Sequence, residues 1–460
     1  MEQNTRQFNN LTEKAVGRLL LEYAIPAVIA MSSVSLYNII DGIFIGKGVS
    51  EKAIMGLALT TPIMSLTAAF GFMVGIGAST LMSIRLGQRD YSTAQRILGN
   101  VILMNSVIGL SLGILMIIFI RPILYFFGAS EVTYPYAHDF MVVILAGNVI
   151  NNLYIGLNAI LRSSNRPQHA MYTTIGTVVL NCIFAALFIF VLDWGISGAA
   201  FATVLAQAVM LGWEIYILND KSNLIHFDLH NMRPDLYIIK ESLIVGMPQF
   251  LMNLCACLVA AIMTRSLTTY GGDVAIGAFG IANRLAMFII MVAIGINQGM
   301  QPIAGYNFGA RRYDRVLKVL KYAILIASVI TCAGFCIGTF FSTPFAELFS
   351  NDAPELTQLS AHAMKRIVLI YPIIGTQIVA SAFFQSIGYA KRSIFLSLTR
   401  QLIFLVPAIL ILPKCFADPL EGLWYAFPFS DATASILTII MLTQVIRHFK
   451  REASGIESLK

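Results

Sequence analysis

Two short stretches share one pattern, Gly87-Gln88-Arg89-Asp90-Tyr91 and Gly309-Ala310-Arg311-Arg312-Tyr313, and they lie 222 residues apart. Each has the form Gly-x-Arg-x-Tyr and follows a long apolar run. A glycine with neighbouring charged residues is typical of the end of a helix. The pair therefore predicts two copies of one helical unit in the chain.

The composition around these stretches excludes a water-soluble domain. Of 460 residues, 57% are hydrophobic and only 12% are charged, with a mean hydropathy of +0.75, whereas soluble domains have about 25% charged residues. A membrane β-barrel would need short alternating segments, but runs such as Val101–Ile120 are almost continuously apolar. The expected fold class is an all-α membrane protein.

Apolar runs between polar breaks predict twelve transmembrane helices, since each needs about 20 residues. The predicted helices cover 19–41, 53–83, 98–120, 135–161, 168–192, 196–218, 242–268, 275–305, 322–342, 363–387, 394–412 and 422–446. The longest polar break separates the first six from the last six. We therefore expect an N-terminal lobe at 1–218, a cytoplasmic linker at 219–241, a C-terminal lobe at 242–446 and a cytoplasmic tail at 447–460.

The distribution of basic residues predicts the orientation. Of the 31 Lys and Arg residues, 23 fall on the side of the termini and seven on the other side, with Arg284 alone assigned to a span. Cytoplasmic loops carry this excess, so both termini are expected in the cytoplasm. The first apolar run is longer than a signal-peptide core, which favours an uncleaved first span.

Later landmarks extend the repeat. Arg166 pairs with Lys391, 225 residues later, and Gly195 pairs with Gly422, 227 residues later. Because each copy holds an even number of spans, the two copies have the same orientation across the membrane. Such parallel repeats are typical of carriers that expose a central site to each side in turn.

Motifs for catalysis are missing from the sequence. It contains neither a Gly-x-x-x-x-Gly-Lys-Ser/Thr phosphate loop nor a His-Glu-x-x-His metal helix, so we expect no enzymatic activity, no cofactor and no metal. His226 and His230 could share a helix face as metal ligands, but a solvated linker is favoured without a third ligand. The basic residues form no stripe or tail, so a nucleic-acid partner is not expected.

The outstanding ionisable residue is Asp41, which has apolar neighbours on both sides in the first span. A charged group inside a span is costly and usually functional. On a helix Tyr37 and Asn38 precede it by four and three residues and share its face. A carboxylate there could exchange a proton for a cation; the alternative is an interfacial carboxylate paired with Lys47. Pro26 predicts a bend in the same helix.

Several softer polar and apolar positions are candidates for lining a cavity. The polar ones could equally be interhelical hydrogen bonds, and the Met and Phe residues could be ordinary packing. They are Tyr37, Asn38, Asn148, Asn151, Asn152, Asn181, Thr203, Gln207, Met287, Phe288 and Met291.

At this point the chain resembles the multidrug and toxic compound extrusion (MATE) transporters. The resemblance rests on the Pro26 to Asp41 spacing, the paired Gly-x-Arg-x-Tyr loops and the segment 195–203. The segment 422–431 is similar to its counterpart in the MepA-type bacterial branch. The resemblance implies two lobes of six helices each and a location in the bacterial inner (plasma) membrane.

In the family, an ion site in the N-terminal lobe uses an acid of span one, an Asn and an Asp of span five, and a Thr of span six. By resemblance these positions are Asp41, Asn181 and Thr203, whereas Ala185 stands where the second acid would be. The loss of one carboxylate weakens sodium coordination more than protonation, so proton coupling is favoured over sodium.

The resemblance implies a monomeric antiporter that exports organic, mostly cationic lipophilic compounds, a xenobiotic transporter of the kind that confers antibiotic resistance. A flippase of lipid-linked precursors from the same superfamily is the first alternative, although it should have a more basic cavity than Arg284 alone provides. A receptor or membrane enzyme without transport is the second. The role of Asp431 is open, between a helix cap and a polar group of the C-terminal lobe.

Overall fold

The computed structural model describes residues 11, 13–49, 51–228, 233–350 and 353–453. Within these ranges the side chains at 38, 39, 41–43, 46–48, 51, 52, 54, 55, 350 and 453 are not described. The described residues form helices joined by short turns and contain no strand. The expected all-α membrane fold is confirmed.

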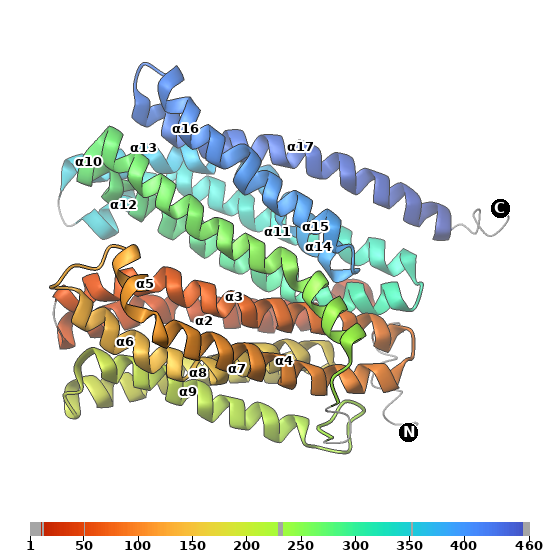
Figure 1. Cartoon of the computed structure of the whole chain (residues 1–460). Helices are drawn as coiled ribbons and strands as arrows, with labels where there is room; N and C mark the ends of the chain where they lie inside the picture. Colours follow the sequence, from red (N-terminus) through yellow and green to blue (C-terminus); the bar gives the residue numbers. More distant parts are fainter. Residues whose placement is uncertain (1–10, 12, 50, 229–232, 351–352, 454–460) are drawn as a thin grey trace. The chain divides into compact units, whose positions relative to one another are not determined.

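The helices of the first half run in order from red to yellow-green in Figure 1. They are α2 (Val16–Gly48), α3 (Glu51–Gly87), α4 (Tyr91–Ile118), α5 (Ile120–Phe126), α6 (Tyr134–Ala146), α7 (Asn148–Ser163), α8 (Pro167–Ala186), the π-helical turn η1 (Leu187–Val191) and α9 (Gly195–Leu218).

The second half follows from green to blue in Figure 1. It comprises α10 (Leu236–Gly309), α11 (Tyr313–Phe340), α12 (Ser342–Ser350), α13 (Pro354–Ile367), the 3₁₀ turn η3 (Val368–Ile370), α14 (Tyr371–Ser386), α15 (Ala390–Leu398), the π-helical segment η4 (Thr399–Leu405), α16 (Val406–Cys415) and α17 (Pro419–Ala453).

The helices account for the twelve predicted spans. Among the described residues, ten helical stretches are long and apolar enough to cross a membrane, and the pair α6 and α7, bent by 55°, makes an eleventh. The longest stretch, α10, has 74 residues and is broken at Gly272, whose φ of 62° and ψ of −158° are not helical. Its segments 236–271 and 273–309 are each long enough to span, which brings the number to twelve.

The two Gly-x-Arg-x-Tyr turns have the same backbone geometry. Arg89 and Arg311 both have a left-handed φ, of 62° and 56°. In the first turn the backbone N of Asp90 donates to the carbonyl O of Arg85 at 2.9 Å, and in the second Arg312 donates to Asn307 at 2.8 Å. The structural repeat therefore keeps the 222-residue offset of the sequence pattern.

A second pair of turns corrects one predicted landmark. Arg166 N donates to Leu161 O at 2.9 Å, and Tyr389 N donates to Phe384 O at 2.8 Å. The turn geometry thus pairs Arg166 with Tyr389, an offset of 223, and not with Lys391. The sequence comparison missed this because the two loops share the backbone turn but not the side chain.

The chain divides into two compact units, each with its own core. One unit contains Ile25–Phe250 and the other contains Leu251–Lys460 together with Ala15–Ala24. The first core gathers residues from Ile45 to Ala202, and the second gathers residues from Met263 to Ala426. Ala15 and the start of α2, up to Ala24, thus group with the second half of the chain.

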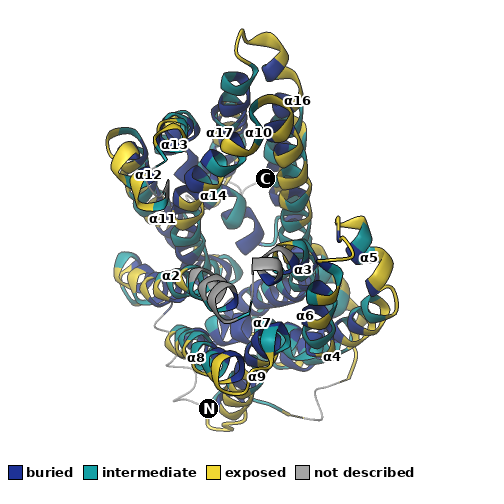
Figure 2. Ribbon diagram, turned by 90° about the vertical axis from the view of Figure 1, so that its left-hand side faces the viewer, coloured by how far each residue is buried: buried dark blue, intermediate teal, exposed yellow. Residues whose placement is uncertain are grey.

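Exposed residues lie on the outer sides of several helices, coloured yellow in Figure 2, and many of them are large and apolar. On α4 this face carries Val107, Leu110, Ile114 and Ile118, each more than half exposed. In water this face would be unfavourable. The surface fits contact with lipid, as expected of a multi-pass membrane protein.

The segment between α9 and α10 is bound to α4. Asp235 caps α10 by accepting from Tyr237 N at 3.0 Å, and its carboxylate contacts Arg96 Nη1 at 3.0 Å. The backbone N of His226 donates to Gln95 Oε1 at 3.2 Å. His230 lies outside the described residues, and among those described no three His, Cys, Asp or Glu side chains form a metal-binding group.

Candidate functional site: polar clusters in the N-terminal unit

Three of the sequence-predicted site residues come together inside the first unit. Asn181 of α8 donates through Nδ2 to Thr203 Oγ1 of α9 at 2.9 Å and to Tyr37 Oη of α2 at 3.3 Å. The hydroxyl oxygens of Tyr37 and Thr203 are 3.4 Å apart. Three helices thus direct polar groups to one point, which we call the outer cluster (Tyr37, Asn181 and Thr203).

The outer cluster keeps one unused acceptor. Asn181 is 2% exposed, and its Oδ1 has no hydrogen-bond partner among the described residues. A buried amide oxygen without a partner is costly, so such atoms often mark a site for a proton donor or a cation. Ala185, one turn further along α8, is fully buried in the apolar core. No carboxylate therefore stands beside Asn181 on its own helix.

The predicted coupling residue Asp41 has its backbone in α2, one helical turn after Tyr37. Its side chain, like that of Asn38, lies outside the described residues. Side chains four residues apart on a helix share a face. The expectation that Asp41 shares the face of Tyr37 therefore stays a prediction. Pro26 lies inside α2, as predicted.

The asparagines of α7 have different surroundings. Asn151 accepts through Oδ1 from Gln207 Nε2 of α9 at 3.1 Å, and Asn148 donates to Gly109 O of α4 at 3.0 Å. Asn152 is fully buried beside Gly71 and Gly109, and neither polar atom of its side chain has a hydrogen-bond partner among the described residues. Asn152 therefore lies in a helix crossing of the first unit.

The predicted apolar surface belongs to the second unit. Met287 and Phe288 of α10 are about half exposed, at 47% and 49%, and Met291 is partly buried. Their neighbours Leu285 and Ile289 are buried in the core of that unit. Arg284 is exposed on the same helix and lies over the ring of Phe349 at 4.8 Å.

A second polar cluster in the first unit was missed by the sequence analysis. Glu214 of α9 is fully buried and accepts through Oε1 from Asn158 Nδ2 of α7 at 3.1 Å. The same Nδ2 is 2.7 Å from Thr173 Oγ1 of α8, and Arg162 of α7 donates to Asn158 Oδ1. Glu214 is the one acidic residue in Gly195–Leu218, so the rule applied to Asp41 would have found it. We call Asn158, Arg162, Thr173 and Glu214 the inner cluster.

The second unit buries an ion pair within its helices. Arg400 in η4 donates through Nε to Asp431 Oδ1 of α17 at 2.8 Å, and Ser430 donates to the Arg400 carbonyl at 2.7 Å. The side chain of Asp431 is 5% exposed. Arg400 falls inside the predicted span 394–412, so the assignment of Arg284 as the one basic residue within a span is corrected.

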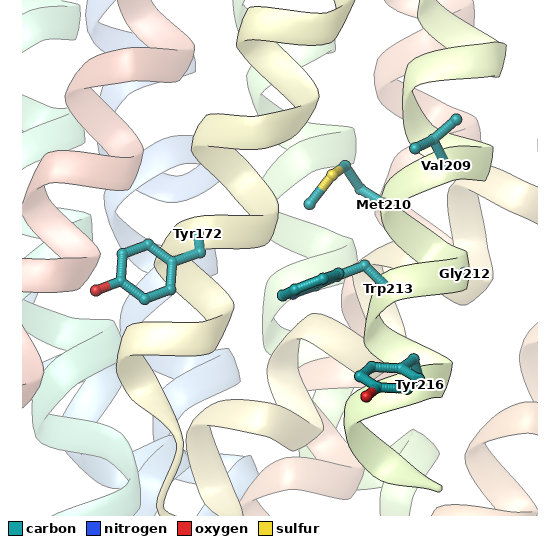
Figure 3. Close-up of a pocket in the computed structure, with 6 residues that line it drawn as sticks. All are labelled: Tyr172, Val209, Met210, Gly212, Trp213 and Tyr216. Atoms are coloured by element: carbon teal, nitrogen blue, oxygen red, sulfur yellow. The ribbon is translucent and has the colours of Figure 1, made fainter.

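An apolar groove of about 600 Å³ lies on the surface between α8 and α9. Figure 3 shows its lining: Tyr172 from α8, and Val209, Met210, Gly212, Trp213 and Tyr216 from α9. Trp and Tyr gather where a membrane protein crosses the boundary between lipid and water. Exposed Trp213 and Tyr216 therefore indicate that the end of α9 near Leu218 lies at such a boundary.

The comparisons with known proteins agree with this architecture. The MatE family matches residues 26–187 and 248–410. The chain is 23% identical over 430 residues to "Multidrug export protein MepA" of Staphylococcus haemolyticus, covering 94% of each. It is 25% identical over 450 residues to "FAD transporter" of Shewanella oneidensis, covering 96% of this chain and 98% of that one.

Solved structures give the same result for the fold. An outward-facing multidrug resistance MATE family transporter of the MOP superfamily aligns with a TM-score of 0.91 and 25% identity, over 96% of this chain and 98% of that one. A MATE structure in the straight conformation aligns with a TM-score of 0.90 and 26% identity.

Fold and repeat together define a polytopic helical transporter with twelve spans in two six-helix lobes. The chain belongs to the MatE family. The family assignment made from the sequence and the twelve-helix fold are thereby confirmed.

Proposed function

We propose that this protein is a secondary active antiporter that exports organic, mostly cationic and lipophilic compounds, driven by protons that enter through the N-terminal lobe. The observation that carries the proposal is the outer cluster, where the buried Asn181 Oδ1 has no hydrogen-bond partner among the described residues and Asn181 Nδ2 bonds to Tyr37, which precedes Asp41 by one helical turn in α2. A second line of support is the name of the relative "Multidrug export protein MepA".

Coupling needs differential binding. A ligand that binds both conformations equally shifts no equilibrium, so proton and drug must each favour a different one. Protonation of Asp41 removes the charge of the proposed site and lets the carboxyl group donate to an acceptor such as Asn181 Oδ1. That exchange of hydrogen bonds favours a closed N-terminal lobe and hence release of the drug.

The choice between proton and sodium follows from the ligand set. A hard cation binds best among several oxygens that include carboxylates. Here the proposed ligands are one carboxylate, the Asn181 amide and the Thr203 hydroxyl, and buried Ala185 adds none. A single carboxyl group needs only a proton to become neutral, so a proton is the favoured coupling ion.

We further propose that the protein works as a monomer in the bacterial plasma membrane with both termini in the cytoplasm. The basic residues of the turns Arg85–Arg96 and Arg311–Lys321 support this orientation. The flippase alternative is less supported, because the named relatives carry multidrugs or FAD and because Arg284 lies beside Phe349 in the second unit. The FAD relative makes an anionic substrate a useful comparison.

The decisive experiment is transport in liposomes under an imposed pH gradient or sodium gradient, each applied alone. Ethidium flux should follow the pH gradient and vanish in Asp41→Asn, while exposed Asp273→Asn of α10 serves as the matched control. FAD in place of ethidium tests the substrate class. Undiminished pH-driven ethidium flux through Asp41→Asn would refute the coupling role, and flux driven by sodium alone would refute the choice of ion.

A further inference from the structure

The outer and inner clusters lie along one face of α9. Thr203, Gln207 and Glu214 are four and seven residues apart, which returns each to nearly the same side of a helix with 3.6 residues per turn. The facing positions on α7 are Asn151 and Asn158, which bond to Gln207 and Glu214 at 3.1 Å each. Polar side chains therefore connect α7 and α9 at two levels, about 10 Å apart along the helix axis.

A hydroxyl group lies between these levels. Tyr154 of α7 lies three residues after Asn151 and four before Asn158, and its side chain lies near Thr174 and Thr177 of α8, whose hydroxyls donate to the carbonyls of Ala170 and Thr173. With the outer cluster about 16 Å from Glu214 along α9, polar groups recur over the whole distance. We call this series the polar track (Asn151, Tyr154, Asn158, Gln207 and Glu214).

The carboxyl group of Glu214, at one end of the polar track, forms no ion pair among the described residues. Glu214 is fully buried, Oε1 has the Asn158 amide, and Oε2 has no hydrogen-bond partner among the described residues. The nearest cation, Arg162, gives its Nη1 hydrogen bond to Asn158 Oδ1 and forms no ion pair with Glu214 in the described part of the chain. A buried carboxylate without a direct cation is costly, so this arrangement fits a neutral, protonated carboxyl group.

The charged and titratable groups that face Glu214 are few. On α7 they are Arg162 and Tyr154, while α8 contributes only the Thr173 hydroxyl. The helix α6 also packs against α9, but it meets α9 through Gly147 at Val204, and its acidic and imidazole groups, His138 and Asp139, precede that contact by more than two turns. Among the described cations near this end of α9, Arg166 donates to the carbonyl of Ile217 at 2.7 Å, and Arg162 is the one that can stabilise an ionised Glu214, by turning from Asn158 to the carboxylate.

We propose that Glu214 is a second proton-binding site of the transporter, which takes up the proton that leaves the Asp41 site and releases it at the Leu218 end of α9. The inference rests on the proposed proton coupling. The transfer balances: the Asp41 carboxyl releases one proton to water beside the polar track, and the Glu214 carboxylate takes up one proton from that water. When Glu214 loses that proton to the aqueous phase, Arg162 pairs with the carboxylate. The aromatic boundary at Trp213 and Tyr216 places this exit at the membrane surface (Figure 3).

The test compares Glu214→Gln, Glu214→Asp and the matched control Glu131→Gln, an exposed acid beside α6. Gln keeps an acceptor for Asn158 but cannot carry a proton. We expect Glu214→Gln to bind ethidium like the unmodified protein while ethidium flux driven by a pH gradient falls at least tenfold. Glu214→Asp should restore part of that flux with a shifted pH profile, and Glu131→Gln should leave it unchanged.

An infrared measurement tests the protonation of Glu214 independently of proton-coupled transport. In an Asp41→Asn background, the infrared band of a protonated carboxylic acid should be present and should disappear when Glu214→Gln is added. Transport by Glu214→Gln at the normal rate and pH profile would overturn the proposal and leave a structural role. If Glu214→Gln does not fold, an unaltered pH profile in Glu214→Asp overturns it. Absence of pH-driven flux in the unmodified protein would instead refute proton coupling itself, while the infrared band still reports on Glu214.

Discussion

Single residues set both the stability and the chemistry of this transporter. Asp90 and Arg312 occupy the same place in the two repeated turns, but only Asp90 caps its helix, since its Oδ1 accepts from Thr93 N at 3.1 Å. The acidic residues also differ in burial. Glu214 and Asp431 are buried between helices, whereas Asp273 and Glu131 are exposed. The type of a residue alone therefore does not predict its role.

Replacement of Asp90 by Ala should lower the free energy of unfolding by about 1 kcal/mol, because the N-cap hydrogen bond of α4 is lost. Arg312→Ala, at the repeated position without a side-chain cap, should change it little. Thermal unfolding in detergent measures both. Equal losses in the two variants would contradict the assignment of the cap.

The contribution of Asp90 should also depend on pH. Desolvation raises its pKa, but hydrogen bonds from Thr93 and the charges of Arg85 and Arg96 outweigh this, so the pKa is lowered overall. A carboxyl group with a lowered folded-state pKa stabilises the fold above its unfolded pKa of about 3.9 and loses that contribution as the pH falls through the folded value. The difference between the native protein and Asp90→Asn should therefore shrink on acidification below pH about 4.

Removal of Arg400 should be far more damaging than removal of the whole ion pair. Arg400→Ala leaves the Asp431 carboxylate buried without its cation, at an expected cost of about 3–5 kcal/mol. The double variant Arg400→Met with Asp431→Leu replaces both charges by apolar groups and should recover most of that loss. The unfolding temperatures of the single and double variants measure the two costs. If both variants are equally destabilised, Arg400 and Asp431 do not act as a coupled ion pair.

For single helices, the residues at which a helix bends or breaks are glycines, and the hydropathy pattern does not mark them. The fourth predicted span, 135–161, is two helices bent by 55° at Gly147, which approaches the side chain of Val204. The seventh and eighth spans join in one 74-residue helix broken only at Gly272. Hydropathy cannot detect such breaks, because glycine occurs both within apolar runs and at their ends.

Two glycines of α10 make a matched test of close helix packing. A Cβ on Gly299 would lie 2.6 Å from the backbone N and Cα of Ala24 in α2, whereas a Cβ on Gly280 would meet nothing within 4 Å. Gly299→Ala should therefore lower the free energy of unfolding by about 1–3 kcal/mol, while Gly280→Ala should raise it by up to about 1 kcal/mol. Thermal unfolding of both variants checks the difference, and a stable Gly299→Ala would contradict the close approach.

At the scale of the whole molecule, a single coupling carboxyl group constrains the energetics. Exchange of one proton for one monovalent drug cation moves no net charge, so only the pH gradient can drive it. One pH unit is about 1.4 kcal/mol, enough for a tenfold gradient of drug. A hundredfold gradient, about 2.7 kcal/mol, needs two pH units.

The rate of ethidium transport should therefore be independent of the membrane potential. A potassium diffusion potential applied without a pH gradient should give no more ethidium accumulation than Asp41→Asn liposomes, which control for passive leak. Dissipation of the pH gradient at constant potential should stop transport. Accumulation driven by potential alone would require more than one coupling charge.

The class of fold, the number of spans and the existence of a repeat could be predicted from the amino-acid sequence, because they depend on the length of apolar runs and on the local residues of the turns. The sequence also indicates Tyr37, Asn181 and Thr203 as site residues, and the structure brings them within hydrogen-bond distance of one another. That meeting depends on residues 144 and 166 positions apart, which no local pattern can place.

Which polar groups inside the spans are buried, and which have hydrogen-bond or ion-pair partners, depends on how the helices pack and could not be predicted from the sequence. Glu214 and Arg400 both fall inside predicted spans, but hydropathy does not say whether they are buried or paired; helix packing encloses Glu214 and pairs Arg400 with Asp431. The free energy of a charged group depends on its solvation and on the groups around it, and both are properties of the folded chain.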